Sequence, residues 1–292
     1  MKIGLILGGG GEVGVAWETG VLAGLAEHAG FSVTDCAVTV GTSAGSIVGA
    51  IATSGADLAE RARGEQRGAY ATSWQLTQHE ADDDQVSAGT AAIPPEMLHL
   101  LVSTEGSIQE RARAIGKLIL TSTPANDDTV FAQIIASLLP DSVADWPDTD
   151  LRVSSVHCET GDTVLWKRAD GIDLTRAIAS SCAVPGLFPP VAFGGSHYCD
   201  TRRTSTVAAL TAEKNLDAIV FIGPSGGALA NTAEEAELEA VSRQGVRVVK
   251  ITEGPDFAEV GNELLDTRLR PRAAQIGLED ARRYVTSIAE LR

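Results

Sequence analysis

The chain has 292 residues and 44% are hydrophobic, enough to bury a substantial core in one large α/β domain or two small ones. Its formal charge of −16 repels nucleic acid and anionic headgroups at long range, so we expect no DNA or RNA partner. Because no apolar run approaches ~18 residues, no signal peptide precedes Lys2 and no C-x-x-C spacing occurs, we expect a cytoplasmic protein whose four cysteines are reduced core thiols.

The first predicted strand, Ile3–Leu7, runs into four consecutive glycines, Gly8–Gly11, and then into apolar residues at helical spacing. Glycines let bare backbone N–H groups converge on one point, and the helix that they open adds the positive end of its dipole. We therefore expect the amides of Gly9, Gly10 and Gly11 to be able to hold an oxyanion.

A second corner follows the stretch Phe31–Val40, which contains the second strand. The pentapeptide Gly41-Thr42-Ser43-Ala44-Gly45 precedes a predicted helix to about Thr53, and a Gly-x-Ser-x-Gly corner of this kind is typical of a nucleophile elbow. A Cβ on either flanking glycine would crowd the neighbouring strand and helix. Both corners should lie at the carboxyl edge of one parallel sheet, with Ser43 as the candidate nucleophile and Ser46 satisfying backbone.

The stretch from residue 57 to residue 147 has a different composition, and no strand stands out in it. We expect a helical insertion, with helices at Pro95–Val102, Ile108–Leu120 and Val130–Leu139. A flexible segment over residues 78–90 fits either a lid over the site or a solvated connection, and both alternatives stay open.

Strand and helix patterns alternate again after the insertion, which favours a three-layer α/β/α fold with a mainly parallel sheet. The predicted strands are Leu151–His157, Thr163–Trp166, His197–Cys199, Ala218–Ile222 and Val246–Ile251, the first two forming a hairpin. The predicted helices are Leu174–Ser180, one from about Ser205, Thr232–Ser242 and Arg272–Leu291.

A serine nucleophile needs a base, and the five histidines of the chain fit that role badly. No histidine lies beyond His197, whereas an α/β-hydrolase triad places its histidine late in the chain. Asp200, at the end of a predicted strand, is the alternative: a carboxylate partly removed from water can act as the base.

The motifs together resemble the patatin-like phospholipase family in content, order and spacing. These are the glycine run, the elbow, the block Ser180–Val191 with its Ala-Val-Pro-Gly-Leu-Phe-Pro-Pro sequence, and Asp200. The resemblance implies one patatin-like α/β hydrolase domain over residues 1–292 that cleaves acyl esters or phospholipids through an acyl-serine intermediate, with no metal or organic cofactor.

The resemblance also implies roles for particular residues. Ser43 would attack the acyl carbonyl, Asp200 would carry the proton, and Gly9, Gly10 and Gly11 would form the oxyanion hole. Pro185, Leu187 and Phe188 would form the wall beside the dyad, and the Leu187–Phe188 region fits either transient contact with a membrane surface or a dry acyl channel.

Two positions depart from the family pattern. Thr201 and Arg202 follow Asp200 where the family usually has Gly-Gly or Gly-Ala, and a β-branched residue resists positive φ. Val13 replaces the arginine or lysine often found after the glycine run, which removes a cation.

Two other functions remain as alternatives. A catalytically inactive lipid- or ligand-binding module would keep the pocket without the chemistry. A dinucleotide-binding protein would use Gly9-x-Gly11-x-x-Gly14 with Asp35, although that acid precedes the most strand-like residues when it should close the second strand. The later Gly223–Gly227 stretch fits a glycine-rich turn, because Pro224 fixes φ before its serine.

Overall fold

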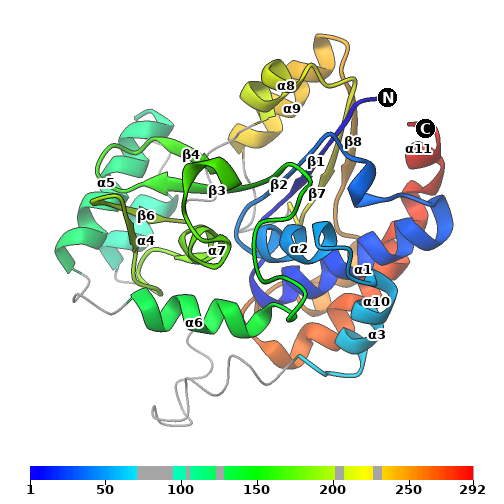
Figure 1. Cartoon of the computed structure of the whole chain (residues 1–292), viewed down its shortest axis with the longest axis horizontal. Helices are drawn as coiled ribbons and strands as arrows, with labels where there is room; N and C mark the ends of the chain where they lie inside the picture. The colour runs from blue at the N-terminus through cyan, green and yellow to red at the C-terminus, as the bar shows by residue number, and fades with distance from the viewer. Residues whose placement is uncertain (71–94, 103–105, 123–127, 201–206, 226–231, 292) are drawn as a thin grey trace.

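The structure, a computed structural model, describes residues 1–70, 95–102, 106–122, 128–200, 207–225 and 232–291 (Figure 1). Its strands are β1 (Ile3–Leu7), β2 (Val38–Gly41), β3 (Leu151–His157), β4 (Thr163–Trp166), β5 (Val191–Phe193), β6 (Ser196–Cys199), β7 (Ala218–Ile222) and β8 (Arg247–Ile251). Its α-helices are α1 (Gly11–Ala29), α2 (Ala44–Thr53), α3 (Leu58–Gln66), α4 (Pro95–Val102), α5 (Ile108–Ser122), α6 (Asp128–Leu138), α7 (Leu174–Cys182), α8 (Val207–Lys214), α9 (Thr232–Arg243), α10 (Arg270–Ala281) and α11 (Val285–Ala289).

The described strands form one mostly parallel sheet, as the sequence predicted. Its order is β5-β6-β3-β2-β1-β7-β8, with β4 also paired to β3, and the pairs among β3, β2, β1, β7 and β8 are parallel. Leu7 at the end of β1 pairs with Gly41 on one side and Ile222 on the other. This register brings the glycine run and the elbow to the same edge of the sheet.

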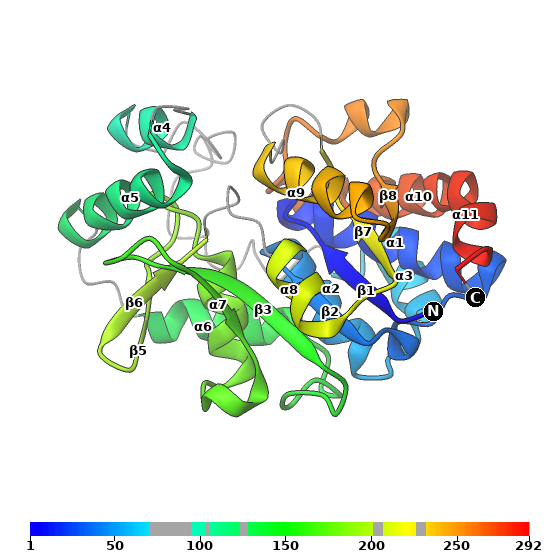
Figure 2. The ribbon, with the colours of Figure 1, turned by 90° about the horizontal axis from the view of Figure 1, so that it is seen from above.

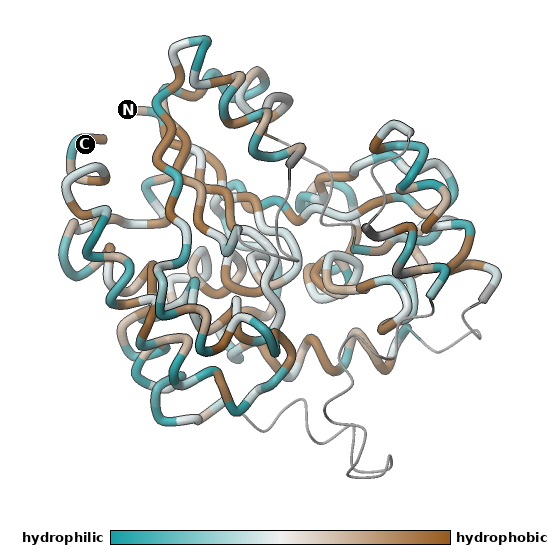
Figure 3. Tube along the Cα trace, turned by 180° about the vertical axis from the view of Figure 1, so that it is seen from behind, coloured by the Kyte–Doolittle hydropathy of each residue, from teal (hydrophilic) through white to brown (hydrophobic). Residues whose placement is uncertain are grey.

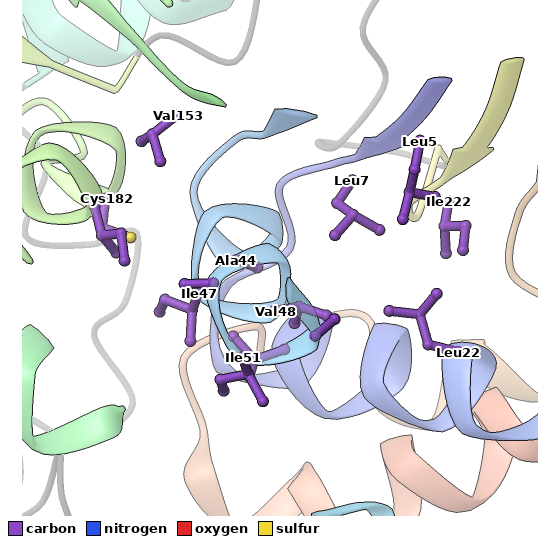
Figure 4. Close-up of a cluster of buried hydrophobic side chains, with 14 of the residues drawn as sticks. Leu5, Leu7, Leu22, Ala44, Ile47, Val48, Ile51, Val153, Cys182 and Ile222 are labelled. Atoms are coloured by element: carbon purple, nitrogen blue, oxygen red, sulfur yellow. The ribbon is translucent and has the colours of Figure 1, made fainter. Parts of the chain in front are cut away.

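Helices cover both faces of the sheet, which gives the α/β/α layering (Figure 2). Alternation along β1 divides the core: Leu5 and Leu7 belong to the cluster that contains α1, α2 and α10, whereas Ile6 packs with residues of α8 and α9. The hydropathy trace places the most hydrophobic segments in the central strands and the helix faces against them (Figure 3). Figure 4 shows part of the first cluster, with Leu7, Ile47 and Val48 between sheet and helices.

Two glycines in the second half of α1 face α10. A Cβ on Gly24 would lie 2.7 Å from the Cβ of Ala281, and a Cβ on Gly20 would collide with the Ala274 carbonyl oxygen. Figure 1 shows α1 and α10 packed side by side. The small residues let two helix backbones approach each other closely.

The described part of residues 57–147 is helical and contains α3 to α6 without a strand. The helix α3 packs against α1 and α10, α5 contacts β3, and α6 contacts α7. Residues 78–90, which fit either a lid or a solvated connection, lie outside the described residues.

Several elements differ from the sequence prediction in their bounds. The second strand, expected within Phe31–Val40, begins only at Val38, because Val33–Asp35 form a 3-10 turn. The strand β5 was missed, because its short Pro-flanked sequence has no strand period and only pairing with β6 across Gly194 and Gly195 makes it extended. The predicted last helix is divided by a 3-10 turn at Arg282–Tyr284.

Candidate active site

Ser43 lies in the sharp turn between β2 and α2, as expected for an elbow. Its φ of 53° and ψ of −118° place it outside the usual regions for a residue with a side chain. Ser46, one turn into α2, donates from Oγ to the Ser43 carbonyl at 2.6 Å, so it satisfies backbone as predicted. Strain of this kind persists only where the surroundings hold it, and it is typical of functional turns.

The glycines that flank Ser43 are required by close approach. A Cβ on Gly41 would lie 2.5 Å from the Ser46 Cα, and a Cβ on Gly45 would lie 2.6 Å from the Cβ of Leu7. Real Cβ atoms do not come this close, so α2 could not sit on the ends of β1 and β2 with any larger residue. This confirms the steric reason given from the sequence.

The glycine run lies directly beside the elbow. The Gly45 N–H donates to the Gly8 carbonyl at 2.8 Å, and the Thr42 N–H donates to the Leu7 carbonyl at 3.0 Å. Within the described part of the chain, no group accepts a hydrogen bond from the amides of Gly9, Gly10 or Gly11. The role of these three amides as an oxyanion hole stays a prediction, and it requires donors of this kind beside Ser43.

Helix α7 reaches the elbow from the other side and contributes a contact that sequence reasoning missed. The Ser43 N–H donates to Ser181 Oγ at 2.8 Å, and Ser181 is fully buried. On the next residue, the Cys182 thiol lies 3.8 Å from Ser46 Oγ, and Figure 4 shows this side chain pointing toward α2. From the sequence, Ser181 was identified only as part of the block Ser180–Val191, because nothing in the local sequence shows what its hydroxyl binds.

Asp200 lies just beyond β6, with 3% of its surface exposed. Its N–H donates to the Ala183 carbonyl at 2.9 Å, which ties it to the residue after α7. Burial raises the pKa of the Cys182 thiol, and the Asp200 charge raises that pKa further, while hydrogen bonding to Ser46 and Ser43 lowers it. Ser43 and Asp200, 157 positions apart (200 − 43), therefore share Cys182 as a neighbour.

The described contacts connect Asp200 to Ala183 and Cys182, and nothing in them tests the pairing of its carboxylate with Ser43 Oγ. Thr201 and Arg202, at which the sequence departs from the family pattern, lie outside the described residues. The dyad therefore stays a prediction supported by proximity.

The histidines that the structure describes do not compete for the role of base. His157 and His197 both contact Glu159, with Nδ1 to carboxylate oxygen distances of 3.1 Å and 2.8 Å. Neither makes a described contact with Ser43, which agrees with the argument against a triad. His79 lies outside the described residues.

The proline-rich block forms a wall that α6 supports. Pro185 is buried, Leu187 and Phe188 are half-buried, and the Phe188 ring stacks on Phe131 of α6 with centroids 4.7 Å apart. Asp128, at the start of α6, accepts hydrogen bonds from Arg176 and from the Ala192 amide, both at 2.8 Å. The sequence gave no sign of this clamp, because its partners are more than 40 positions apart.

The structure also describes Asp35, Ser225 and the four cysteines, which were singled out from the sequence. Asp35 ends the 3-10 turn before β2, so it does not stand at the carboxyl end of the second strand, where a ribose-binding acid belongs. Ser225 lies after β7 and its amide donates to Glu253 Oε2 at 2.8 Å, while the rest of the predicted glycine-rich turn, from residue 226 on, lies outside the described residues. All four cysteines are free thiols; Cys158, Cys182 and Cys199 are buried and Cys36 is half-buried.

The described residues lack two features that would point to other classes of site. No helix there is long and apolar enough to cross a bilayer. No group of three or more His, Cys, Asp or Glu side chains in the same residues is arranged to hold a metal ion.

Comparison with protein-family models matches residues 5–213 to the family described as patatin-like phospholipase. No curated protein matches the chain. Among solved structures, VipD from Legionella pneumophila matches at 14% identity and a TM-score of 0.44, over 98% of this chain and 67% of that one. The type III effector ExoU matches at 18% identity and a TM-score of 0.36, over 97% and 53%. The complex of ExoU with SpcU from Pseudomonas aeruginosa matches at 18% identity and a TM-score of 0.32, over 96% of this chain and 52% of that one. The chain thus spans about half the length of ExoU.

Proposed function

The chain belongs to the patatin-like phospholipase family, and from that membership we propose that it is a lipid acyl hydrolase of the phospholipase A or carboxylesterase type. The observation that carries the proposal is the strained, buried Ser43 beside the glycine run, whose Gly9, Gly10 and Gly11 amides have no acceptor among the described residues. A serine held in this way, with backbone donors in the neighbouring turn, suits acyl transfer.

In the proposed reaction, Ser43 Oγ attacks the acyl carbonyl carbon while its proton passes to Asp200. The carbonyl π electrons move to oxygen, and the resulting oxyanion is held by the amides of Gly9, Gly10 and Gly11. Removing one such donor typically costs ~10²–10³ in kcat. Collapse of this intermediate expels the alcohol, which takes the proton from Asp200, and leaves an acyl-serine.

The second half of the reaction repeats these steps with water. Water attacks the carbonyl carbon of the acyl-serine while Asp200 takes a proton from that water. Asp200 then returns the proton to Ser43 Oγ when the fatty acid leaves. Burial of Asp200 at 3% exposure supports this role, because partial removal of a carboxylate from water makes it a better base.

The wall formed by Pro185, Leu187 and Phe188 is proposed to contact the acyl chain. Because Phe188 stacks on Phe131, which is 3% exposed, its ring lies against the protein interior. This favours a dry channel over insertion of Phe188 into a membrane. Liposome co-sedimentation checks it: Phe188→Ser should leave binding to vesicles unchanged, and a loss of binding would favour the membrane contact.

The central experiment combines hydrolysis of p-nitrophenyl esters of graded chain length with fluorophosphonate labelling read by mass spectrometry. We expect one labelled serine, Ser43, and loss of both labelling and turnover in Ser43→Ala. The matched control is Ser54→Ala, which removes a hydroxyl from the other end of α2, where it only caps Ile51. Slow turnover unchanged in Ser43→Ala would refute the enzyme and favour an inert binding module.

Asp200→Asn tests the base separately. We expect kcat to fall by at least ~10² while the circular dichroism spectrum and the melting temperature stay close to those of the wild type. Near wild-type kcat in a folded Asp200→Asn protein would remove Asp200 from the mechanism and leave Ser43 in place.

A further inference from the structure

Arg270, the first residue of α10, is the centre of a buried ion network that joins α10 to α1 and α3. Its guanidinium pairs with Glu12 and donates to both Glu65 oxygens, with Nη2–Oε1 at 2.6 Å and Nε–Oε2 at 2.9 Å. Arg61 Nε adds a bond of 3.2 Å to Glu65 Oε1. Arg270 is 2% exposed, Glu65 0% and Glu12 7%, so water screens these charges little.

Glu12 stands where a negative charge opposes the proposed chemistry. It directly follows the glycine run as the second residue of α1, so its carboxylate reduces the positive potential at the helix N-terminus. Its charge also reaches the site, since Glu12 contributes to the raised pKa of the Cys182 thiol beside Ser43. An oxyanion near Ser43 would be repelled by the same carboxylate if nothing compensated it.

The segment before Arg270 also holds the glycine run in place. The Val13 N–H donates to the Leu264 carbonyl at 3.1 Å, and Gly11, with φ of +61°, passes so near that a Cβ would lie 2.6 Å from the same oxygen. Val13 itself is fully buried and apolar. Position 13 therefore supplies no cation, whereas Arg270, 257 positions later in the chain (270 − 13), brings its guanidinium to Glu12, the residue before Val13.

We propose that Arg270 is a positioning residue for the reaction at Ser43, which keeps Glu12 neutralised and fixed in the first turn of α1 so that the glycine amides face the oxyanion. This proposal rests on the proposed function, because it concerns an oxyanion formed at Ser43. The network carries two positive and two negative side chains, so it is neutral only while Arg270 is present.

The variants differ in the net charge of the buried network. Arg270→Gln leaves Glu12, Glu65 and Arg61, a net charge of one negative, and the double variant Glu12→Gln with Arg270→Gln is neutral again. We expect Arg270→Gln to lower kcat for p-nitrophenyl esters and the rate of fluorophosphonate labelling by ~30-fold, with KM changed less than ~3-fold. Adding Glu12→Gln should restore both to within ~5-fold of wild type.

Arg152→Gln is the matched control, because Arg152 is 5% exposed and bridges Glu213 and Asp150 without touching the glycine run. It should lose stability with kcat unchanged. The proposal would be overturned if Arg270→Gln and the double variant lost the same amount of kcat. A wild-type kcat in a folded Arg270→Gln protein would also overturn it.

If Arg270→Gln does not fold, Arg270→Lys decides instead, because lysine keeps the charge. Retention of at least about a third of kcat supports compensation of charge, and a loss as large as ~30-fold overturns it. A wild-type protein that neither turns over esters nor is labelled at Ser43 would instead refute the proposed function, so the two failures are distinguishable.

Discussion

Ser181 offers the sharpest test of how the elbow is held. Its hydroxyl accepts the hydrogen bond of the Ser43 N–H at 2.8 Å, with Ser181 at 0% and Ser43 at 7% exposure. Alanine at position 181 would leave a buried N–H without an acceptor in a turn whose φ of 53° is already strained. The substitution therefore acts on the nucleophile without changing it.

The magnitude follows from two limits. If the elbow stays rigid, the orphaned N–H costs about 1–3 kcal/mol of stability. If the elbow relaxes to satisfy that N–H, it releases strain of about 1–3 kcal/mol and Ser43 leaves its attacking geometry. At tenfold per ~1.4 kcal/mol, the second limit lowers kcat by ~5- to ~150-fold. Either the melting temperature or kcat must fall.

Ser180→Ala is the matched control, because the two serines are adjacent and equally buried. Ser180 Oγ donates to the Ala177 carbonyl at 2.7 Å, one turn back in α7, so its removal leaves no orphaned amide. For this variant we expect the unfolding free energy to fall by less than ~1 kcal/mol and kcat to stay within ~2-fold of wild type.

Thermal melting, ester hydrolysis and the rate of fluorophosphonate labelling are measured on both variants. The reasoning fails if Ser181→Ala and Ser180→Ala have the same melting temperature and the same kcat. It also fails if Ser181→Ala changes only KM, because a displaced nucleophile must slow the labelling reaction.

Three further outcomes are expected. Gly45→Ala, whose Cβ would lie 2.6 Å from that of Leu7, should cost at least ~2 kcal/mol in unfolding free energy and abolish labelling; normal labelling would contradict the close packing of the elbow. Burial raises the pKa of Glu234 from 4.5 to about 7, so stability from its protonated form is present below 4.5 and lost as pH rises through about 7. Glu234→Gln should therefore have a higher melting temperature than the wild type only at pH values above about 7. A difference in melting temperature that is the same at every pH would refute this prediction. Phe131→Ala removes the ring stacked on Phe188, so it should cost about 3 kcal/mol and raise KM more for long acyl esters than for short ones, as graded p-nitrophenyl esters would reveal.

Local backbone requirements made the two corners predictable. Gly41 and Gly45 leave no room for a Cβ, so the packing at these two positions selects glycine, which is visible in the sequence on either side of Ser43. The strands β3, β4 and β7 were also predicted at their observed bounds, because their apolar or alternating patterns are bounded by polar turns.

The sequence did not show the partners that hold these corners. It indicated a missing cation at Val13 but not that Arg270 would bring one to Glu12, and it quoted Ser181 without its bond to Ser43. The order of elements, the mostly parallel sheet and the candidate nucleophile were thus fixed by local composition, since steric limits and hydrophobic period act within a few residues. The bond from the Ser43 N–H to Ser181, the buried ion network and the clamp at Asp128 were decided by tertiary structure alone, because a long-range contact depends on which surfaces meet when the chain packs, and no short pattern records that choice.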